Sequence, residues 1–251
     1  MSDVSSKVVP NKVAIVTGAS RGIGAAIAGR LARDGFTVVV NYAGNAETAE
    51  TLARGIEQAG GRALTARADV ADPAAVRRMF EAAETAFGGI DVVVNNAGIM
   101  QLARIADADD ALFDRQVAVN LKGTFNVLRE AAKRLHDGGR IVNFSTSVVG
   151  TKLESYGVYT ATKAAVEALT GILAKELRGR SITVNAVAPG PTGTDLFFHG
   201  KSPELVERLA KAAPLERLGT PEDIAGVVAF LAGPDGGWVN GQVLRANGGL
   251  V

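Results

Sequence analysis

The chain has 251 residues, of which 47% are hydrophobic and 21% charged, and its formal net charge is +1. This size suits one large domain, and the near-neutral charge gives no electrostatic reason to expect a nucleic acid or an anionic membrane as a partner. The chain has no cysteine and only two histidines, which excludes disulfides, thiolate metal sites and a cysteine nucleophile, so we expect no metal site.

The N-terminal residues and the lengths of the apolar runs indicate where in the cell the protein is expected. Met1 to Pro10 is polar and lacks the apolar core of a signal peptide. No apolar run approaches the roughly 20 residues that a membrane span needs. We therefore expect a cytoplasmic protein without a membrane partner, in which residues 1–251 form a single domain and residues 1–10 a flexible N-terminus.

Short apolar runs alternate with helical patterns along the whole chain. The predicted strands are Val13–Val16, Phe36–Val40, Ala63–Ala68, Asp91–Asn95, Arg140–Phe144, Ile182–Val187 and Gln242–Ala246. The predicted helices are Gly22–Arg33, Ala46–Gln58, Asp72–Phe87, Asp109–Leu135, Ser155–Arg178 and Pro221–Leu231. Strands that are apolar on both faces and separated by helices predict an α/β fold, with a parallel sheet covered on both sides. A barrel would also fit, but seven strands and a glycine-rich first turn favour an open, doubly wound, Rossmann-type sheet.

The glycine-rich turn joins the first predicted strand to the first predicted helix, and it reads Thr17-Gly18-Ala19-Ser20-Arg21-Gly22-Ile23-Gly24. Glycine lets backbone approach a pyrophosphate, and a helix N-terminus offers unpaired N–H groups. The spacing is not the usual G-x-G-x-x-G, and a tight turn that merely needs glycine is the alternative. The strand before the turn and the helix after it favour a dinucleotide site.

The end of the second predicted strand indicates which dinucleotide binds. NAD sites usually place Asp or Glu there to hold the ribose 2′-hydroxyl. This chain has Asn41-Tyr42-Ala43 instead, with no carboxylate until Glu47. Arg21 and Ser20 in the glycine turn would attract a 2′-phosphate. The sequence therefore predicts NADP(H), although a solvated arginine at a helix start is the alternative for Arg21.

Tyr159 and Lys163 are four residues apart in a predicted helix, so their Cβ atoms should lie roughly 5–6 Å apart on one face. An ordinary tyrosine loses its proton near pH ~10, and a fixed ammonium nearby lowers that pKa. The pair could then act as an acid and base near neutral pH. The same spacing occurs on many solvated helix faces. The pair therefore indicates a catalytic site only if the other motifs of the chain agree.

Together these motifs resemble the short-chain dehydrogenases/reductases from Lys12 to Val251. The resemblance rests on the glycine turn and, in chain order, on Asn95-Asn96-Ala97-Gly98, Asn120, Tyr159-x-x-x-Lys163 and Pro189-Gly190. Three further stretches are similar to the branch that contains 3-oxoacyl-carrier-protein reductases, trihydroxynaphthalene reductases and plant-type NADPH-dependent aldehyde reductases: Val40–Ala43, Ala188–Thr192 and Trp238–Gln242.

The resemblance implies roles for three catalytic residues. Tyr159 would donate a proton to the carbonyl oxygen of the substrate. Lys163 would bind the nicotinamide ribose and lower the pKa of Tyr159. Asn120 would hold a water that continues the proton relay.

A fourth catalytic group should be a hydroxyl that orients the carbonyl, and here the chain departs from the family pattern. Counting from the predicted strand Arg140–Phe144, or thirteen residues back from Tyr159, places this hydroxyl on Thr146. Aligning the family's Ser-x-x-Gly motif with Ser147 to Gly150 instead places the hydroxyl on Ser147, with a turn before Tyr159 that is one residue shorter. Ser145 is a third alternative, and all three could simply bond local backbone.

The resemblance also implies the cofactor contacts. The glycine turn would hold the diphosphate, the segments after the third and fourth strands would pack along adenine and ribose, and the segment after the sixth would hold the carboxamide. The expected cofactor-binding residues are Gly18, Ser20, Arg21, Gly22, Ile23, Gly24, Asn41, Tyr42, Ala43, Asp69, Val70, Asn96, Ala97, Gly98, Tyr159, Lys163, Pro189, Gly190, Thr192 and Thr194.

Substrate selectivity should come from the least regular segments, 99–106, 150–157 and 193–214. The last contains Leu196-Phe197-Phe198 between two glycines, a candidate lid over an apolar substrate. The resemblance further implies a homotetramer or homodimer, in which the helices at 109–135 and 155–178 pair across a twofold axis.

The sequence thus predicts an NADPH-dependent oxidoreductase that reduces a small-molecule ketone or aldehyde to an alcohol, with Tyr159 as proton donor. Two alternatives remain. One is an NAD-dependent alcohol dehydrogenase of the same family, and the other is a dinucleotide-binding protein without catalysis.

Overall fold

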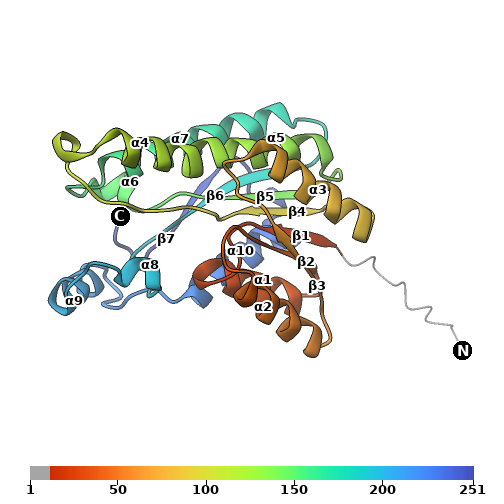
Figure 1. Ribbon diagram of the computed structural model, residues 1–251, viewed down its shortest axis with the longest axis horizontal. Coiled ribbons are helices and arrows are strands. Elements are labelled where there is room, and N and C mark those ends of the chain that lie inside the picture. Colours follow the sequence, from red (N-terminus) through yellow and green to blue (C-terminus); the bar gives the residue numbers. More distant parts are fainter. Residues whose placement is uncertain (1–11) are drawn as a thin grey trace, which may run out of the picture.

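The strands pair in the order β3-β2-β1-β4-β5-β6-β7, and every pairing is parallel. This arrangement comes from a computed structural model that describes residues 12–251 (Figure 1). The strands are β1 (Val13–Val16), β2 (Thr37–Tyr42), β3 (Arg62–Arg67), β4 (Val92–Asn95), β5 (Arg140–Phe144), β6 (Thr183–Pro189) and β7 (Val243–Ala246). The prediction of an open, doubly wound parallel sheet is confirmed. The predicted flexible N-terminus, residues 1–10, lies outside the described residues.

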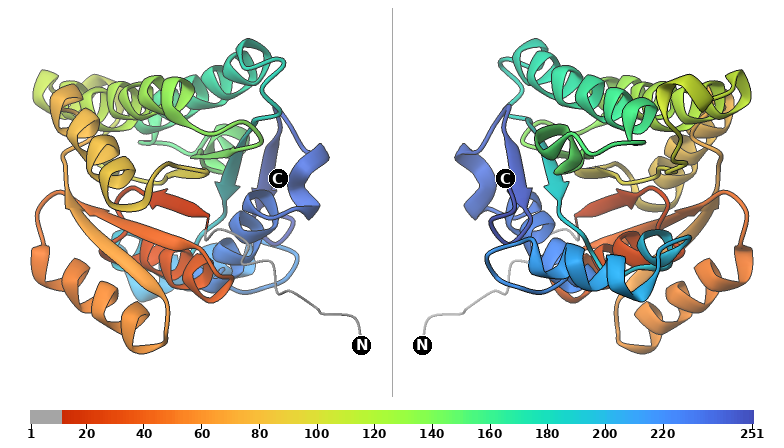
Figure 2. Two further views of the ribbon diagram at one scale, coloured as in Figure 1. Left: turned by 90° about the vertical axis from the view of Figure 1, so that its right-hand side faces the viewer. Right: turned by 90° about the vertical axis from the view of Figure 1, so that its left-hand side faces the viewer.

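Helices cover both faces of the sheet (Figures 1 and 2). One layer contains α1 (Gly22–Arg33), α2 (Ala46–Gln58) and α10 (Pro221–Ala232). The other contains α3 (Pro73–Phe87), α4 (Asp110–Gln116), α5 (Thr124–Arg134) and α7 (Gly157–Glu176). Three further helices lie toward one end of the molecule in Figure 1: α6 (Val148–Thr151), α8 (Asp195–Phe198) and α9 (Pro203–Lys211). Between residues 12 and 251, no helix combines the length and apolarity needed to cross a bilayer.

The sheet separates two hydrophobic cores because successive strand residues point to opposite faces. Ile15 of β1 and Val93 of β4 join the core that includes residues of α3, α5 and α7. Val16 and Val94, one position further along the same strands, join the core that includes residues of α1 and α10. Each central strand is therefore buried on both sides, which explains why its sequence is apolar throughout.

The chain changes direction across the sheet at β1, which pairs with β2 on one side and β4 on the other. In open parallel sheets, ligands bind outside the carboxyl ends of the strands at such a switch point. The glycine turn follows β1, and Asn96-Ala97-Gly98 follows β4. The topology therefore brings these two segments to the same edge.

The long helical pattern predicted at 109–135 is not one regular helix. A π-helical segment, Val117–Gly123, separates α4 from α5, and such bulges are frequent at functional sites. Gly123 packs so closely on Val70 that an added Cβ would lie 2.6 Å from Val70 Cγ2. The π segment also contains the buried Asn120.

Two other predicted boundaries differ from the structure. The helix predicted to start at Ser155 starts at Gly157, because Ser155 has a left-handed backbone (φ 68°) that a helix cannot continue. The segment 193–214, predicted to be irregular, contains α8 and α9. Ser202 begins α9 by accepting a hydrogen bond from the Leu205 N–H, and Pro203 occupies the first helical position, where proline is favoured.

Candidate active site

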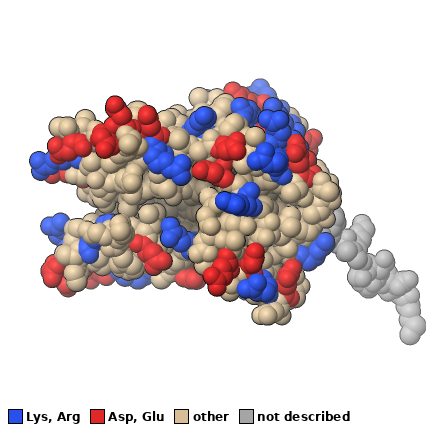
Figure 3. Space-filling view, viewed as in Figure 1, with Lys and Arg blue, Asp and Glu red and all other residues tan. Residues whose placement is uncertain are grey.

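A cleft of about 460 Å³ opens at the carboxyl ends of β1 and β4. The surface of this side of the molecule is hollowed between the two helical layers, with acidic and basic residues interspersed around it (Figure 3). The residues expected to hold the adenosine and diphosphate line the cleft: Gly18, Ser20, Arg21, Gly22, Ile23, Gly24, Asn41, Tyr42, Ala43, Asp69, Val70, Asn96, Ala97 and Gly98. Thr194, expected near the carboxamide, lines it as well. The structure therefore assembles this predicted set from segments that are far apart in the sequence.

The glycine turn is shaped for close backbone approach. Gly18 has a left-handed backbone (φ 61°), and a Cβ on Gly24 would lie 2.4 Å from the Gly18 carbonyl oxygen. Asn96 supports the turn by donating hydrogen bonds to the carbonyls of Thr17 (2.9 Å) and Gly18 (3.2 Å). Helix α1 starts beside it without a side-chain cap, so its N-terminal N–H groups are free for an anion. This cradle fits a dinucleotide diphosphate.

The side chain of Asn41 is occupied inside the protein. Its Oδ1 accepts the Gly18 N–H (3.1 Å), and its Nδ2 donates to the carbonyls of Ala66 (3.0 Å) and Ala68 (3.1 Å). Asn41 thus lines the cleft, as predicted, while its side chain holds the glycine turn; a contact with the cofactor stays a prediction. The cleft still lacks a carboxylate at this strand end, and the exposed Arg21 lines it.

Sequence reasoning missed one cation of this cleft. Arg115, from α4, lines the cleft and forms an ion pair with Asp69 at 3.6 Å between Nη1 and Oδ2. Arg115 lies on a helix that is remote in sequence from the glycine turn, so no local sequence pattern indicated that it would line the cleft.

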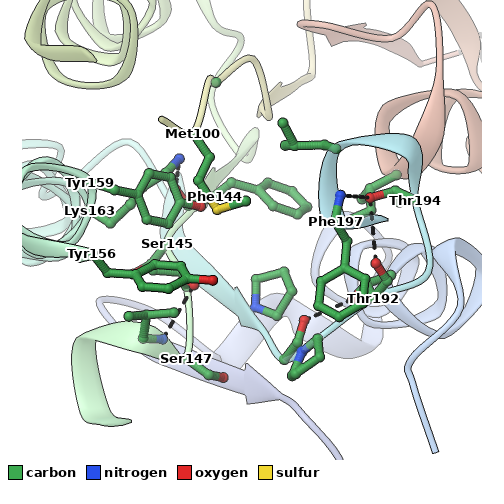
Figure 4. Close-up of a pocket in the computed structure, with 18 of the residues that line it drawn as sticks. Met100, Phe144, Ser145, Ser147, Tyr156, Tyr159, Lys163, Thr192, Thr194 and Phe197 are labelled. Atoms are coloured by element: carbon green, nitrogen blue, oxygen red, sulfur yellow. Dashed lines mark hydrogen bonds between the residues drawn. The ribbon is translucent and has the colours of Figure 1, made fainter. Parts of the chain in front are cut away.

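A second cavity, of about 240 Å³, continues from the cleft (Figure 4). Thr146, Ser147, Tyr159, Lys163, Pro189, Gly190 and Thr192 line it. Ile23, Asn96, Gly98, Ile99, Thr194 and Leu196 line both cavities. The predicted catalytic groups thus lie at the end of the predicted nucleotide cleft, apart from Asn120.

Helix α7 carries Tyr159 and Lys163 into the cavity, and burial determines the pKa of both. The Lys163 ammonium donates to the Phe144 carbonyl at 2.8 Å and lies 5.9 Å from the centre of the Tyr159 ring. Burial lowers the pKa of Lys163 to about 8. Burial also raises the pKa of Tyr159 to about 12, and a hydrogen bond from the Thr146 side chain only partly opposes this rise.

The prediction that Lys163 lowers the pKa of Tyr159 is therefore wrong for this structure. The ammonium points at a backbone carbonyl, and the loss of water around the phenol outweighs any stabilisation of the phenolate. At neutral pH the Tyr159 hydroxyl keeps its proton. A protonated phenol is the form that a proton donor requires.

The structure distinguishes the three hydroxyls after β5. Ser147 Oγ donates to the Ala188 carbonyl (3.1 Å) and accepts from Asn247 Nδ2 (3.0 Å). Ser145 Oγ donates to Glu167 at 2.6 Å. Thr146 Oγ1 accepts the Val148 N–H (3.3 Å) and interacts with Tyr159. Of the three, the Thr146 hydroxyl is the one directed to Tyr159.

Asn120 is fully buried and lines neither cavity. Its Oδ1 accepts the Ile99 N–H (2.8 Å), and its Nδ2 donates to the Ile99 carbonyl (2.9 Å) and to Thr162 Oγ1 (3.3 Å). Thr162 Oγ1 in turn donates to the Tyr159 carbonyl at 2.7 Å. The expectation that Asn120 holds a water finds no support in these side-chain contacts, which instead tie the segment after β4 to α7.

Of the predicted lid, Leu196 and Phe197 line the cavity and Phe198 does not. Leu196 and Phe198 are both exposed (44% and 47%), and a lid stays a prediction. Met100, Leu153, Tyr156, Leu209 and Ala212 also line the cavity, and all five lie in the segments predicted to set selectivity, whereas Leu250 lies outside them. The Ser202-Pro203 helix start and the spacing of Leu205 and Leu209 could have revealed α9. Leu250 carries no local signal, because only the tertiary fold brings it to the cavity.

Replacing Lys163 with methionine should stabilise the protein at pH 7. Folding lowers the pKa of Lys163 from its ordinary 10.5 to about 8, so the charged form costs on the order of 3 kcal/mol below pH ~8. This cost fades as the pH rises from about 8 to 10.5. We expect Lys163→Met to raise the melting temperature at pH 7 and to raise it less at pH 10.

Lys175→Met, on the exposed side of the same helix, is the matched control and should leave the melting temperature unchanged. A lower melting temperature for Lys163→Met at pH 7 would show that the bond to the Phe144 carbonyl outweighs the cost of burying the charge.

Comparison with known proteins agrees with this geometry. Residues 18–251 match the family model described as "Enoyl-(Acyl carrier protein) reductase". A short-chain type dehydrogenase/reductase of Picea abies is 51% identical over 96% of this chain and 92% of that protein. The protein named NADPH-dependent aldehyde reductase 2, chloroplastic, of Arabidopsis thaliana is 47% identical over 96% of this chain and 94% of its own length.

Among solved structures, a short chain dehydrogenase from Burkholderia cenocepacia in complex with NADP superposes with a TM-score of 0.90. It is 40% identical and covers 95% of this chain and 97% of its own. These similarities span the sheet, the glycine turn and the Tyr159–Lys163 helix. The chain belongs to the short-chain dehydrogenase/reductase family of oxidoreductases.

Proposed function

We propose that this protein is an NADP(H)-dependent carbonyl reductase that reduces a ketone or an aldehyde to an alcohol, with Tyr159 as the proton donor. The observation that carries this proposal is the buried Tyr159 phenol, which keeps its proton at neutral pH at the inner end of a dinucleotide-shaped cleft. A bound nicotinamide would supply the hydride.

Residues around the cleft support NADP(H). The glycine turn would hold the diphosphate, Asp69 and Val70 would flank the adenine, and Arg21 would meet a 2′-phosphate. Two relatives point the same way: one is named an NADPH-dependent aldehyde reductase and the other was solved with NADP. The missing carboxylate at the end of β2 removes the usual partner of an NAD ribose.

Three side chains would act on the carbonyl. The Tyr159 hydroxyl would pass its proton to the carbonyl oxygen as negative charge develops there. The Thr146 hydroxyl would donate a second hydrogen bond to the same oxygen and orient it. The Lys163 ammonium, which keeps donors beyond the one bonded to the Phe144 carbonyl, would hold the nicotinamide ribose.

Burial raises the pKa of Tyr159 to about 12, so the phenol is protonated at neutral pH, which is the form that donates a proton to a carbonyl oxygen. The second predicted alternative is a protein that binds the dinucleotide without catalysis. Such a protein would not need Thr146, Tyr159 and Lys163 to line the same cavity.

We also propose a homodimer or homotetramer. Phe113, Phe125 and Ile172, on α4, α5 and α7, are about half exposed (51%, 46% and 53%), and apolar side chains gathered on one helical layer suit an interface between copies. A cytoplasmic location stays a prediction, since the name of one relative places that protein in the chloroplast.

Tyr159→Phe tests the proposed function directly. Without the hydroxyl, the carbonyl oxygen lacks its proton donor, so we expect kcat to fall by about 100-fold or more. The assay follows the absorbance of NADPH with 1-phenyl-1,2-propanedione as substrate. NADPH affinity, measured by fluorescence, should not change, and full activity in this variant would refute the role of Tyr159.

The hydroxyl assignment is tested by comparing Thr146→Ala with Ser147→Ala. Because Ser147 is occupied by Ala188 and Asn247, we expect the Thr146 variant to lose about tenfold or more in kcat and Thr146→Ser to recover most of it. A larger loss of kcat in Ser147→Ala would reverse the assignment.

Arg21→Ala tests cofactor selection. Loss of one charged contact to the 2′-phosphate should weaken NADPH binding about tenfold and leave NADH binding unchanged. Arg33→Ala, at the far end of the same helix α1, is the matched control. Equal weakening for both dinucleotides, or tighter binding of NADH than NADPH by the unmodified protein, would contradict an NADP(H) site.

A further inference from the structure

The substrate part of the cavity is apolar and offers no free charge. Its walls include Met100, Leu153, Leu196, Phe197, Leu209 and Leu250. Within residues 12–251, Lys163 is the only Lys, Arg, His, Asp or Glu that lines the cavity. Its ammonium donates to the Phe144 carbonyl and, in the proposed function, to the nicotinamide ribose rather than to the substrate. A charged group on a substrate would lose its water here without finding a counter-charge. The cavity therefore suits an uncharged molecule.

Most hydroxyls on the cavity wall are already bonded to protein. Ser145 donates to Glu167, and Ser147 to the Ala188 carbonyl. Thr192 Oγ1 donates to the Gly190 carbonyl (3.0 Å), and Thr194 Oγ1 donates to the Thr192 carbonyl (3.4 Å). Thr151 Oγ1 has no partner among the described residues, but this oxygen is buried away from solvent.

Tyr156 differs from these residues. It occupies the N-cap position of α7 without a side-chain capping hydrogen bond, three residues before Tyr159, and its ring lies 6.4 Å from the Tyr159 ring, centre to centre, at 64°. Both rings extend into the same cavity (Figure 4). Burial is the sole cause that raises the pKa of Tyr156, with no hydrogen bond from the described residues acting on its hydroxyl. Tyr156 is thus a neutral, unengaged donor beside the proposed catalytic phenol.

We propose that Tyr156 is a specificity-determining residue that donates a hydrogen bond to a second oxygen of the substrate. The preferred substrates are then small, uncharged, mainly apolar carbonyl compounds with an acceptor oxygen on a neighbouring carbon, such as α-diketones. This assignment depends on the proposed carbonyl reduction. One carbonyl oxygen faces Tyr159 and Thr146, while the other faces Tyr156.

The selectivity follows from the cost of leaving a donor unpaired. A monoketone that fills the cavity displaces water from the Tyr156 hydroxyl and offers it no acceptor in an otherwise apolar wall. A diketone replaces that water with its second oxygen. A site built to hydrogen-bond a substrate group discriminates against the analogue that lacks it.

The experiment compares two substrates with the same skeleton, 1-phenyl-1,2-propanedione and 1-phenyl-2-propanone, in wild-type protein and Tyr156→Phe. The variant removes one oxygen and keeps the ring. We expect kcat/KM for the diketone to fall about fivefold to tenfold, mostly through KM, and that for the monoketone to stay within about twofold. Leu153→Ala is the matched control, because losing an apolar wall should lower both values alike.

Binding measurements keep the inference testable apart from catalysis. Calorimetric titration of the NADP⁺-loaded protein with each ketone should show the diketone bound more tightly by wild type, and the difference reduced in Tyr156→Phe. If the wild-type protein reduced neither ketone, the proposed function would fail. The titration would still show whether Tyr156 binds the second oxygen of the diketone. Equal losses for both ketones in Tyr156→Phe, or no loss for either, would overturn the assignment.

Discussion

The hydrogen bond from the buried Lys163 ammonium to the Phe144 carbonyl is the contact around which the site is organised. It joins α7 to the end of β5, so that Tyr159 on the helix meets Thr146 just beyond the strand. Lys163 is only 4% exposed, and burying its charge works against folding. The protein keeps this destabilising group where it can meet a nucleotide, as expected of a functional site.

Gly98 shows how tightly the surrounding segments converge. A Cβ at this position would lie 3.3 Å from Asn120 Oδ1 and 3.4 Å from Lys163 Nζ. The segment after β4, the π-helical segment and α7 therefore meet so closely that even an alanine here would be in tight contact with Asn120. Asn120 and Thr162 complete this junction through hydrogen bonds to Ile99 and to the Tyr159 carbonyl. Buried polar side chains hold the proposed catalytic helix in place, while the cavity itself stays apolar.

Much of the fold and half of the site could be predicted from the sequence, because their signals are local. The apolar runs gave the strands to within about two residues at most ends, and Asp72-Pro73 located the start of α3. The glycine turn and the Tyr159–Lys163 pair were recognisable from spacing alone. Residues that reach the site through tertiary packing, such as Arg115 and Leu250, had no such signal.

The errors have a common physical cause, which is the environment that the fold creates around a residue. Sequence spacing predicted that Lys163 lowers the pKa of Tyr159, but burial raises it to about 12. Asn41 lines the cleft as predicted, but its sequence position gave no sign that its amide also joins the glycine turn to the end of β3. The choice between Thr146 and Ser147 depended on Asn247, about 100 residues further along the chain.

In the proposed reaction the Tyr159 phenol lies beside the reactive ring of a bound nicotinamide, and a crystal structure of the protein with NADP⁺ is the most direct test. We expect a nicotinamide ring between Pro189-Gly190 and the Tyr159 hydroxyl, with that hydroxyl facing C4 of the ring across space for a carbonyl. An ordered ring elsewhere, with Tyr159 turned away from it, would contradict this role of Tyr159.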